Sequence, residues 1–133
     1  MNKIIIASGP VIVENNRVLL NQHGDTEFWK FCGGQVEDFS TNLMENARRE
    51  VKEEMGIKIK ILDETPYFYF TRKEDRGETI DVILVHFLAE RVGEIKPGED
   101  IRKWDWLDID KLDRENLAPN IKPVLKHFGF LKE

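Results

Sequence analysis

The sequence contains little cysteine, no long apolar run and no excess of positive charge. Cys32 is its one cysteine, so no disulfide can form within the chain, and a reducing, cytoplasmic location is expected. No apolar stretch approaches the roughly 20 residues that a membrane span needs. The formal net charge of −5 argues against binding to nucleic-acid polymers or acidic membranes. A small anionic ligand remains compatible, because a bound divalent cation can reverse the local charge.

The composition is that of a folded globular protein. Hydrophobic residues make up 41% of the 133 positions, which suits a single domain over residues 1–133 with a core of its own. The first residues, MNKIIIASGPVIV, have the lysine and apolar run of a signal peptide, but Gly9-Pro10 interrupts the run. We therefore interpret this segment as a first strand rather than a secretory leader.

Strand patterns surround one long helical pattern, which predicts a mixed α/β (α+β) fold. Asn15-Asn16 predicts the turn of a first hairpin. A second hairpin is expected from residues 58–72 and 79–92, joined by the polar loop 73–78. Shorter strands are expected at residues 28–31 and 102–109.

Two helices are expected to pack on this sheet. The first runs from the capping pair Asn42 and Glu45 to about Met55, where Gly56 is well placed to end it. The second lies near the C-terminus, within residues 120–133, and Pro123 fits its first turn. The predicted architecture is therefore one mixed β-sheet flanked by the two helices, an α/β/α sandwich.

The first helix brings three carboxylates together. At about 100° per residue, Glu50, Glu53 and Glu54 fall in one narrow sector beside the apolar stripe, with Glu54 inside its edge. The stripe itself is formed by Leu43, Met44, Ala47, Val51 and Met55.

These carboxylates conflict with one another unless something neutralises them. Ion pairs of Arg49 with Glu45 or Glu53 describe a solvated acidic face, but Glu50 and Glu54 are four residues apart and repel. A partly buried, unpaired carboxylate is costly, so either its pKa rises or it recruits a cation. A hard divalent ion held by carboxylate oxygens resolves the conflict.

A glycine pair precedes this helix. Gly33-Gly34 allows the backbone to approach another group closely and to offer a carbonyl to an ion, although a simple tight turn is the alternative. A glycine turn followed by a helix with three grouped carboxylates favours the metal-site interpretation.

These features resemble the signature of the Nudix hydrolases, G-x5-E-x7-R-E-U-x-E-E-x-G-U with U aliphatic. Residues 49–57, REVKEEMGI, match its second half at every fixed position. Upstream, FWKFCGGQVE is similar to the family's W-x-x-PGG-x-x-E, with Cys32 where proline is common. Downstream, KWDWLDIDKL resembles the strand and turn near the family's C-termini. The resemblance covers nearly the whole chain.

The first half of the signature departs from the pattern. Ser40 stands where the family has glutamate, Phe39 replaces a family glycine, and one extra residue precedes Arg49. The missing acidic group usually braces the signature arginine, so Glu37 or Glu45 is the hypothesised brace here.

The resemblance implies a metal-dependent pyrophosphohydrolase that cuts the P–O–P bond of a nucleoside diphosphate derivative with Mg²⁺ or Mn²⁺. It implies that Glu50, Glu53, Glu54 and the Gly34 carbonyl surround the metal. Carboxylate and carbonyl oxygens are the ligands that such hard ions prefer.

The expected catalytic set consists of Glu53, Glu50, Arg49 and Glu99. Glu53 is the first choice as the general base, with Glu99 or Asp100 as the alternative in a later loop, and Arg49 acts as a structural brace.

Substrate contacts are expected from aromatic residues. Tyr67 and Tyr69 belong to the strand YFYF, and two side chains of this strand could stack on a base. The alternative is that most of them lie in the core, as the two-residue period of a strand predicts. Trp106 could line the pocket. Cys32 and the three histidines are interpreted as structural or surface residues.

Several functions stay open at this point. The short chain and the W-x-W strand favour conversion of a (d)NTP to a (d)NMP and pyrophosphate, with ADP-ribose, a nucleotide sugar or a dinucleoside polyphosphate as alternatives. A nucleotide-binding Nudix module without turnover is a second class, and an acidic scaffold is a third. The expected partner is a small nucleotide, and a homodimer is left open.

Overall fold

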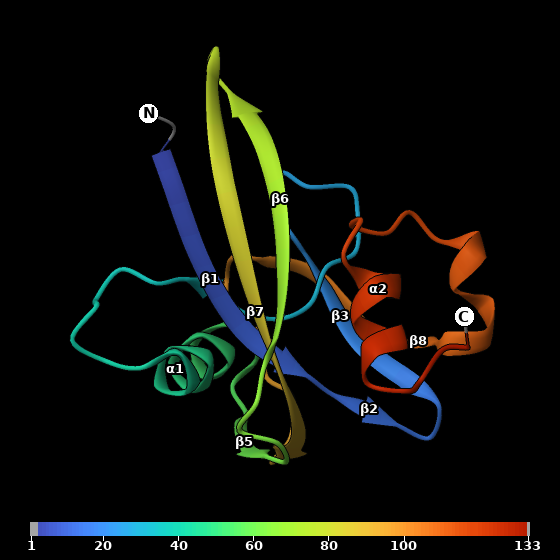
Figure 1. Cartoon of the computed structure of the whole chain (residues 1–133). Helices are drawn as coiled ribbons and strands as arrows, with labels where there is room; N and C mark the ends of the chain where they lie inside the picture. The colour runs from blue at the N-terminus through green and yellow to red at the C-terminus, as the bar shows by residue number, and fades with distance from the viewer. Residues whose placement is uncertain (1–2, 133) are drawn as a thin grey trace.

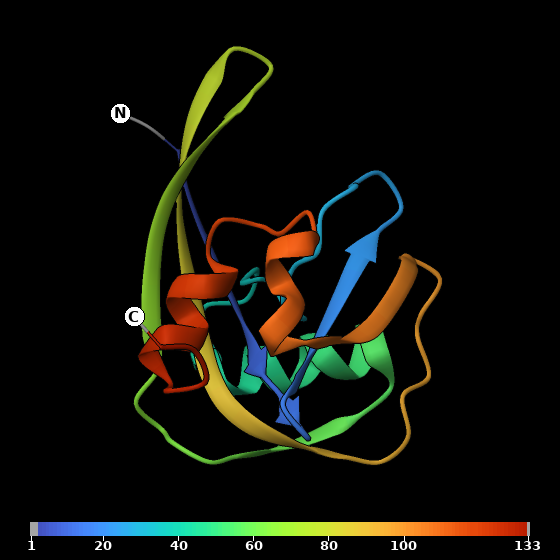
Figure 2. The same ribbon diagram turned by 90° about the vertical axis from the view of Figure 1, so that its right-hand side faces the viewer.

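The chain folds into two β-sheets with helices packed against them (Figures 1 and 2). The structure is a computed structural model and describes residues 3–132. The larger sheet contains β1 (Lys3–Val11), β4 (Gly34–Gln35), β5 (Lys58–Ile61), β6 (Tyr67–Asp75) and β7 (Glu78–Val92). The smaller sheet contains β2 (Val13–Glu14), β3 (Arg17–His23) and β8 (Ile101–Asp108). The helices are α1 (Leu43–Met55), the 3-10 helix η1 (Ile109–Arg114) and α2 (Ile121–His127).

The larger sheet is mixed, which confirms the predicted α+β class. β1 runs parallel to β7, whereas β4, β5 and β6 pair with their neighbours in antiparallel fashion. One sheet was expected and two are found, because the first apolar segment is interrupted at Ile12 and continues as β2 in the second sheet. The predicted turn is confirmed, since Asn15 and Asn16 have φ values of 52° and 59° and join β2 to β3.

Helix α1 has the boundaries that its capping residues predict. The Asn42 side chain accepts a hydrogen bond from the Glu45 backbone N–H at 2.8 Å. Gly56 adopts a left-handed conformation, with φ of 70°, and its N–H donates to the Lys52 carbonyl. Local chemistry at both ends therefore fixes the register of the carboxylate-bearing face.

The second hairpin differs from the prediction in two ways. Its first arm is divided into β5 and β6, because the segment between them contains Pro66 and a turn in which Thr65 N–H donates to Asp63. Its loop is only Arg76-Gly77, both with positive φ, so the strands continue through the polar residues that were expected to form the loop. The long β6–β7 hairpin extends beyond the rest of the molecule (Figure 2).

Two other predicted elements are shorter than expected. Residues 28–31 form isolated bridges, Asn21 with Lys30 and Trp29 with Leu117, instead of a strand. The C-terminal helix ends at His127, because Gly129 adopts a positive φ of 85° shortly afterwards. None of the helices within residues 3–132 has the length and apolar content needed to cross a bilayer.

Strand β3 lies between two parts of the core. Val18 and Leu20 face the cluster that also contains α2 residues, whereas Leu19 faces the cluster under α1. This alternation follows from the two-residue period of a strand. Because β3 is covered on both faces, α1 is held on one side and α2 on the other (Figure 1).

Candidate active site

The glycine turn lies directly against helix α1. Gly34 pairs with Ser8 of β1, and a Cβ on Gly34 would lie 2.2 Å from Glu50 Oε2. Only a residue without a side chain therefore leaves room for the Glu50 carboxylate at this point. The group that the glycine pair approaches is thus the Glu50 side chain of α1.

Glu54 is the most buried member of the carboxylate cluster, which we define as Glu50, Glu53 and Glu54. Its side chain is 10% exposed. Oε1 accepts a hydrogen bond from the Gly33 N–H at 2.9 Å, and Oε2 lies 2.9 Å from His23 Nε2. Asn21 Nδ2 is a more distant donor, at 3.4 Å. Glu54 thus ties the glycine turn and β3 to α1.

Glu50 and Glu53 share Arg49. Arg49 Nη2 lies 3.0 Å from Glu50 Oε1, and Nη1 lies 3.3 Å from Glu53 Oε1. Glu53 is 60% exposed, whereas Glu50 is 16% exposed. Burial raises the pKa of the Glu50 carboxyl, although the Arg49 guanidinium opposes that shift. The helix therefore carries one partly desolvated carboxylate beside one that solvent reaches freely.

Neither hypothesised brace contacts Arg49 in the way expected. Glu45 lies 3.3 Å from Arg48, one residue earlier, and Glu37 is in an exposed loop. Arg49 is instead held by another residue of α1, since its Nη2 donates a hydrogen bond to Asn46 Oδ1 at 2.7 Å. The partners of Arg49 are thus Asn46, Glu50 and Glu53, all on the same helix.

The loop that carries Glu99 and Asp100 is attached to the last turn of α1. The Gly98 N–H donates to the Glu54 carbonyl and the Lys96 N–H to the Met55 carbonyl, both at 2.7 Å. Glu99 and Asp100 are themselves exposed. The attachment brings this loop to the same end of the helix as the carboxylate cluster.

A cleft of about 450 Å³ opens on the other side of the glycine turn. Its walls come from β1, β6, β7, the glycine turn and the segment before α2. Of the three predicted substrate contacts, Tyr69 lines the cleft. Tyr67 packs against the core cluster that includes α2 and stacks on His127. Trp106 packs against the core cluster under α1, beside Arg91. The aromatic strand does not lie mostly in the core, because Phe68 and Phe70 are 46% and 72% exposed.

The cleft contains a buried polar pair. His86 and Asn120 are 4% and 5% exposed, and His86 Nε2 lies 3.1 Å from Asn120 Nδ2. Burial lowers the pKa of His86 to about 4, so its imidazole is neutral near pH 7. His86 Nδ1 has no hydrogen-bond partner among the described residues.

Lys30 also lines the cleft, next to the glycine turn. Burial lowers the pKa of its amine, while Glu54 and Asp25 attract the charge and Lys73 repels it. Lys73 belongs to the opposite wall, on β6. Positive side chains therefore face the same space from two elements.

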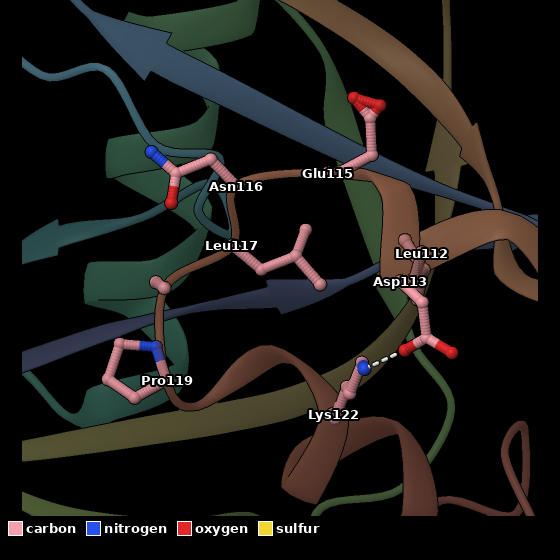
Figure 3. A pocket seen from close by; sticks show the side chains of 8 residues that line it. Leu112, Asp113, Glu115, Asn116, Leu117, Pro119 and Lys122 are labelled. Carbon is pink, nitrogen blue, oxygen red and sulfur yellow. Dashed lines mark hydrogen bonds and ion pairs between the residues drawn. The ribbon is translucent and has the colours of Figure 1, made fainter.

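A second hollow of about 340 Å³ lies between η1 and α2 (Figure 3). Lys122 and Asp113 form an ion pair across one side of it, and Leu117 points inward. Its lining does not include the glycine turn, whereas the lining of the first cleft does. We therefore place the candidate site in the first cleft.

The donor atoms suit a hard divalent cation. The space left by the missing Cβ of Gly34 holds the Glu50 carboxylate, and the predicted ligands are all oxygen atoms. Within residues 3–132, however, no three His, Cys, Asp or Glu side chains are gathered around one metal position. Arg49 and His23 engage the carboxylates instead. The structure brings Glu50 next to Gly34 but does not converge the four predicted ligands on one point.

Sequence reasoning did not identify several polar residues of this region. Asn46 had a usable signal, since it falls between Glu50 and Glu53 on the helical wheel. His23, His86 and Asn120 had none, because their neighbours in space are distant in sequence. Cys32 is buried packing, as expected, and burial raises the pKa of its thiol.

A family model described as the NUDIX domain matches residues 5–128. This match covers most of the chain, and the chain therefore belongs to the Nudix hydrolase family.

Individual relatives agree with this assignment. An ADP-ribose pyrophosphatase from Methanocaldococcus jannaschii is 28% identical over 127 residues, which cover 92% of this chain and 72% of the relative. The nucleoside triphosphatase NudI of Escherichia coli is 24% identical over 110 residues, covering 77% of each chain. The solved structure of a NUDIX hydrolase from Nitrosomonas europaea has a TM-score of 0.78 at 18% identity, covering 95% of this chain and 88% of that one, which shows the shared fold.

Proposed function

We propose that this protein is a metal-dependent pyrophosphohydrolase that cleaves the P–O–P bond of a nucleoside diphosphate derivative. The observation that carries the proposal is the glycine turn, which has the carboxylate cluster on one side and a cleft with positive side chains on the other. A pyrophosphate needs both, a divalent cation for its charge and a compartment for the attached nucleoside.

The proposed metal ligands are the carboxylates of Glu50, Glu53 and Glu54 and the Gly34 carbonyl. Bound Mg²⁺ or Mn²⁺ would neutralise the diphosphate and lower the pKa of a water ligand. In the chain itself, Arg49 holds Glu50 and Glu53 ready on one side of α1. The high exposure of Glu53 allows its side chain to rotate away from Arg49, which would bring its carboxylate toward the other two.

Glu53 is the proposed general base, because its exposed carboxylate can reach a water molecule and accept its proton. The alternative is Glu99, with Asp100 beside it, in the loop attached to the end of α1. Water then attacks one phosphorus, the P–O–P bond breaks, and the bridging oxygen leaves with the bonding electrons as part of the departing phosphoryl product, which is pyrophosphate when a (d)NMP is formed.

The cleft is proposed to hold the nucleoside. Tyr69 offers a ring face for stacking, and the His86–Asn120 pair offers hydrogen-bonding groups to the edge of a base. Lys30 and Lys73 would attract the phosphates. This set suits a planar, polar ring attached to an anion better than it suits a purely apolar ligand.

The favoured substrate is a (d)NTP, giving a (d)NMP and pyrophosphate. The volume of about 450 Å³ is near the lower end of the range for small-molecule sites, about 300–1,000 Å³, so it suits one nucleoside rather than two linked groups. The archaeal relative named as an ADP-ribose pyrophosphatase favours ADP-ribose as the second candidate. The unpaired, buried Cys32 supports a reducing, cytoplasmic location.

One panel assay tests the proposal. The protein is incubated with Mg²⁺ or Mn²⁺ and with dNTPs, NTPs, ADP-ribose, sugar nucleotides and dinucleoside polyphosphates, and the products are separated by chromatography. A (d)NTP hydrolase releases pyrophosphate and a monophosphate, whereas ADP-ribose yields AMP and ribose 5-phosphate. Thermal stabilisation by nucleotides without any product would indicate a binding module instead.

A further inference from the structure

Asn46 is a buried amide in the middle of α1. It is 2% exposed, and on the helical wheel it falls between Glu50 and Glu53. Asparagine is disfavoured inside helices, and a buried amide without partners is costly. Its presence here therefore requires hydrogen bonds that only this site supplies.

The amide group joins three segments of the chain. Asn46 Nδ2 donates to Ser8 Oγ at 2.8 Å and to the Gly34 carbonyl at 3.1 Å. Asn46 Oδ1 accepts from Arg49 Nη2 at 2.7 Å. Ser8 Oγ donates in turn to the Leu43 carbonyl at 2.9 Å, which closes the network on α1. Both amide hydrogens and the amide oxygen are thus in use.

The two groups that Asn46 contacts both belong to the proposed metal site. The Gly34 carbonyl is a proposed metal ligand, and Arg49 contacts both Glu50 and Glu53. A single side chain therefore fixes the direction of a carbonyl and of a guanidinium on either side of Glu50.

We infer that Asn46 is the positioning residue of the metal site and takes the place of the missing acidic brace. This inference rests on the function proposed above. Ser40, which stands at the position of that acidic group, is turned away in an exposed loop, where its hydroxyl donates to Asp38 at 2.6 Å. An amide does more than a carboxylate can do, because it accepts from Arg49 and also donates to the Gly34 carbonyl.

The test compares the Mn²⁺ affinity of the full chain and its variants, measured by calorimetry and by electron paramagnetic resonance. Asn46→Ala removes all three contacts, and Asn46→Asp keeps an acceptor for Arg49 but loses the donors. We expect both variants to bind Mn²⁺ about 10- to 100-fold more weakly than the wild type, as for other residues that orient metal ligands. Asn46→Ser serves if the alanine variant fails to fold.

Ser8→Ala is the matched control. It removes a buried hydrogen bond of the same network but leaves the bonds from Asn46 to Gly34 and Arg49 in place. We expect it to lower the melting temperature while its Mn²⁺ affinity stays close to the wild-type value. Thermal unfolding of every variant separates a loss of stability from a loss of metal binding.

The outcomes are distinct. Wild-type Mn²⁺ affinity in Asn46→Ala overturns the inference alone, and wild-type affinity in Asn46→Asp overturns the role of the donated hydrogen bond. Equal losses of affinity in Ser8→Ala and Asn46→Ala reduce Asn46 to a structural residue and also overturn it. Failure of the wild-type chain to bind Mn²⁺ overturns the proposed function, and this inference with it.

Discussion

The two sides of the glycine turn are built in different ways. On the α1 side, the carboxylate cluster comes from one short stretch of a single helix, and each carboxylate already has a partner in Arg49 or His23. On the cleft side, Tyr69, His86 and Asn120 come from three separate elements, and His86 Nδ1 has no partner among the described residues.

This difference separates two tasks. On the α1 side, the carboxylates come from one helix and their partners are side chains that a cation can displace, which suits chemistry common to a family. The cleft side offers hydrogen-bonding capacity that no described residue uses, which suits recognition. We therefore expect variants on the α1 side to change metal binding and rate, and variants on the cleft side to change substrate affinity.

The largest expected effect is on the α1 side. Glu53→Gln removes the proposed base while keeping the size of the side chain, and we expect turnover to fall by about 10²- to 10⁴-fold. Steady-state hydrolysis of the best substrate measures it, with circular dichroism to verify the fold. Glu45→Gln is the control, because Glu45 lies on the same helix and contacts Arg48 instead. Near-normal turnover in Glu53→Gln would transfer the role to Glu99.

The next effect concerns stability on the cleft side. The pKa of His86 is about 4 in the folded protein, below the ordinary value of 6.5, so between these pH values the unfolded chain binds a proton that the folded protein does not. The free energy of unfolding should therefore fall as the pH falls from 6.5 to 4, by about 3 kcal/mol from this group.

Urea unfolding of the wild type and of His86→Gln, at pH 7 and pH 4, isolates that contribution. Carboxylates titrate in both proteins, so the difference between them reports on His86. If the free energy of unfolding falls by the same amount in the wild type and in His86→Gln between pH 7 and pH 4, the imidazole is not held neutral by burial.

The third prediction concerns the glycine turn between the two sides, where Gly34→Ala adds one methyl group. In Gly34→Ala the new Cβ would meet the Glu50 carboxylate at 2.2 Å, and this flexible side chain must move away. We expect Mn²⁺ affinity to fall by about 10- to 100-fold with a smaller change in stability. Gly24→Ala is the control, because a Cβ there meets nothing within 4 Å. Calorimetric titration measures the Mn²⁺ affinity of both variants. Equal affinities would contradict the placement of Glu50 and Gly34 in one metal site.

The smallest expected effect tests recognition. Lys30→Met removes a positive charge from the cleft and keeps most of the side-chain volume. We expect KM for the nucleotide to rise by about tenfold with little change in kcat, as for loss of one charged hydrogen bond. Lys60→Met, on the exposed part of β5, should leave both constants unchanged. An equal fall in kcat would place Lys30 among the groups that act in the transition state instead.

The sequence could predict what depends on nearby residues. The ends of α1 follow from Asn42 and Gly56, and the position of Glu54 at the edge of the apolar stripe follows from helical periodicity. The family and its proposed metal ligands follow from the same short segment. These features share one property, which is that their partners lie within a few residues.

The remaining features depend on distant contacts. The pairing of His86 with Asn120 joins positions 34 residues apart, and the contact of Asn46 with Ser8 joins positions 38 apart. No periodicity encodes such pairs. The predicted hairpin loop was wrong for a related reason, because cross-strand partners stabilise polar residues within the strands, as where Thr79 donates a hydrogen bond to Glu74.

The thiol of Cys32 can report on the opening of the glycine turn. It is the chain's one cysteine, it directly precedes Gly33, and it is buried with its reactive form suppressed. An alkylating reagent can therefore modify it only when this turn separates from α1 or the whole protein unfolds. The labelling rate should record how often the site opens, and a bound cation that holds the turn closed should slow it.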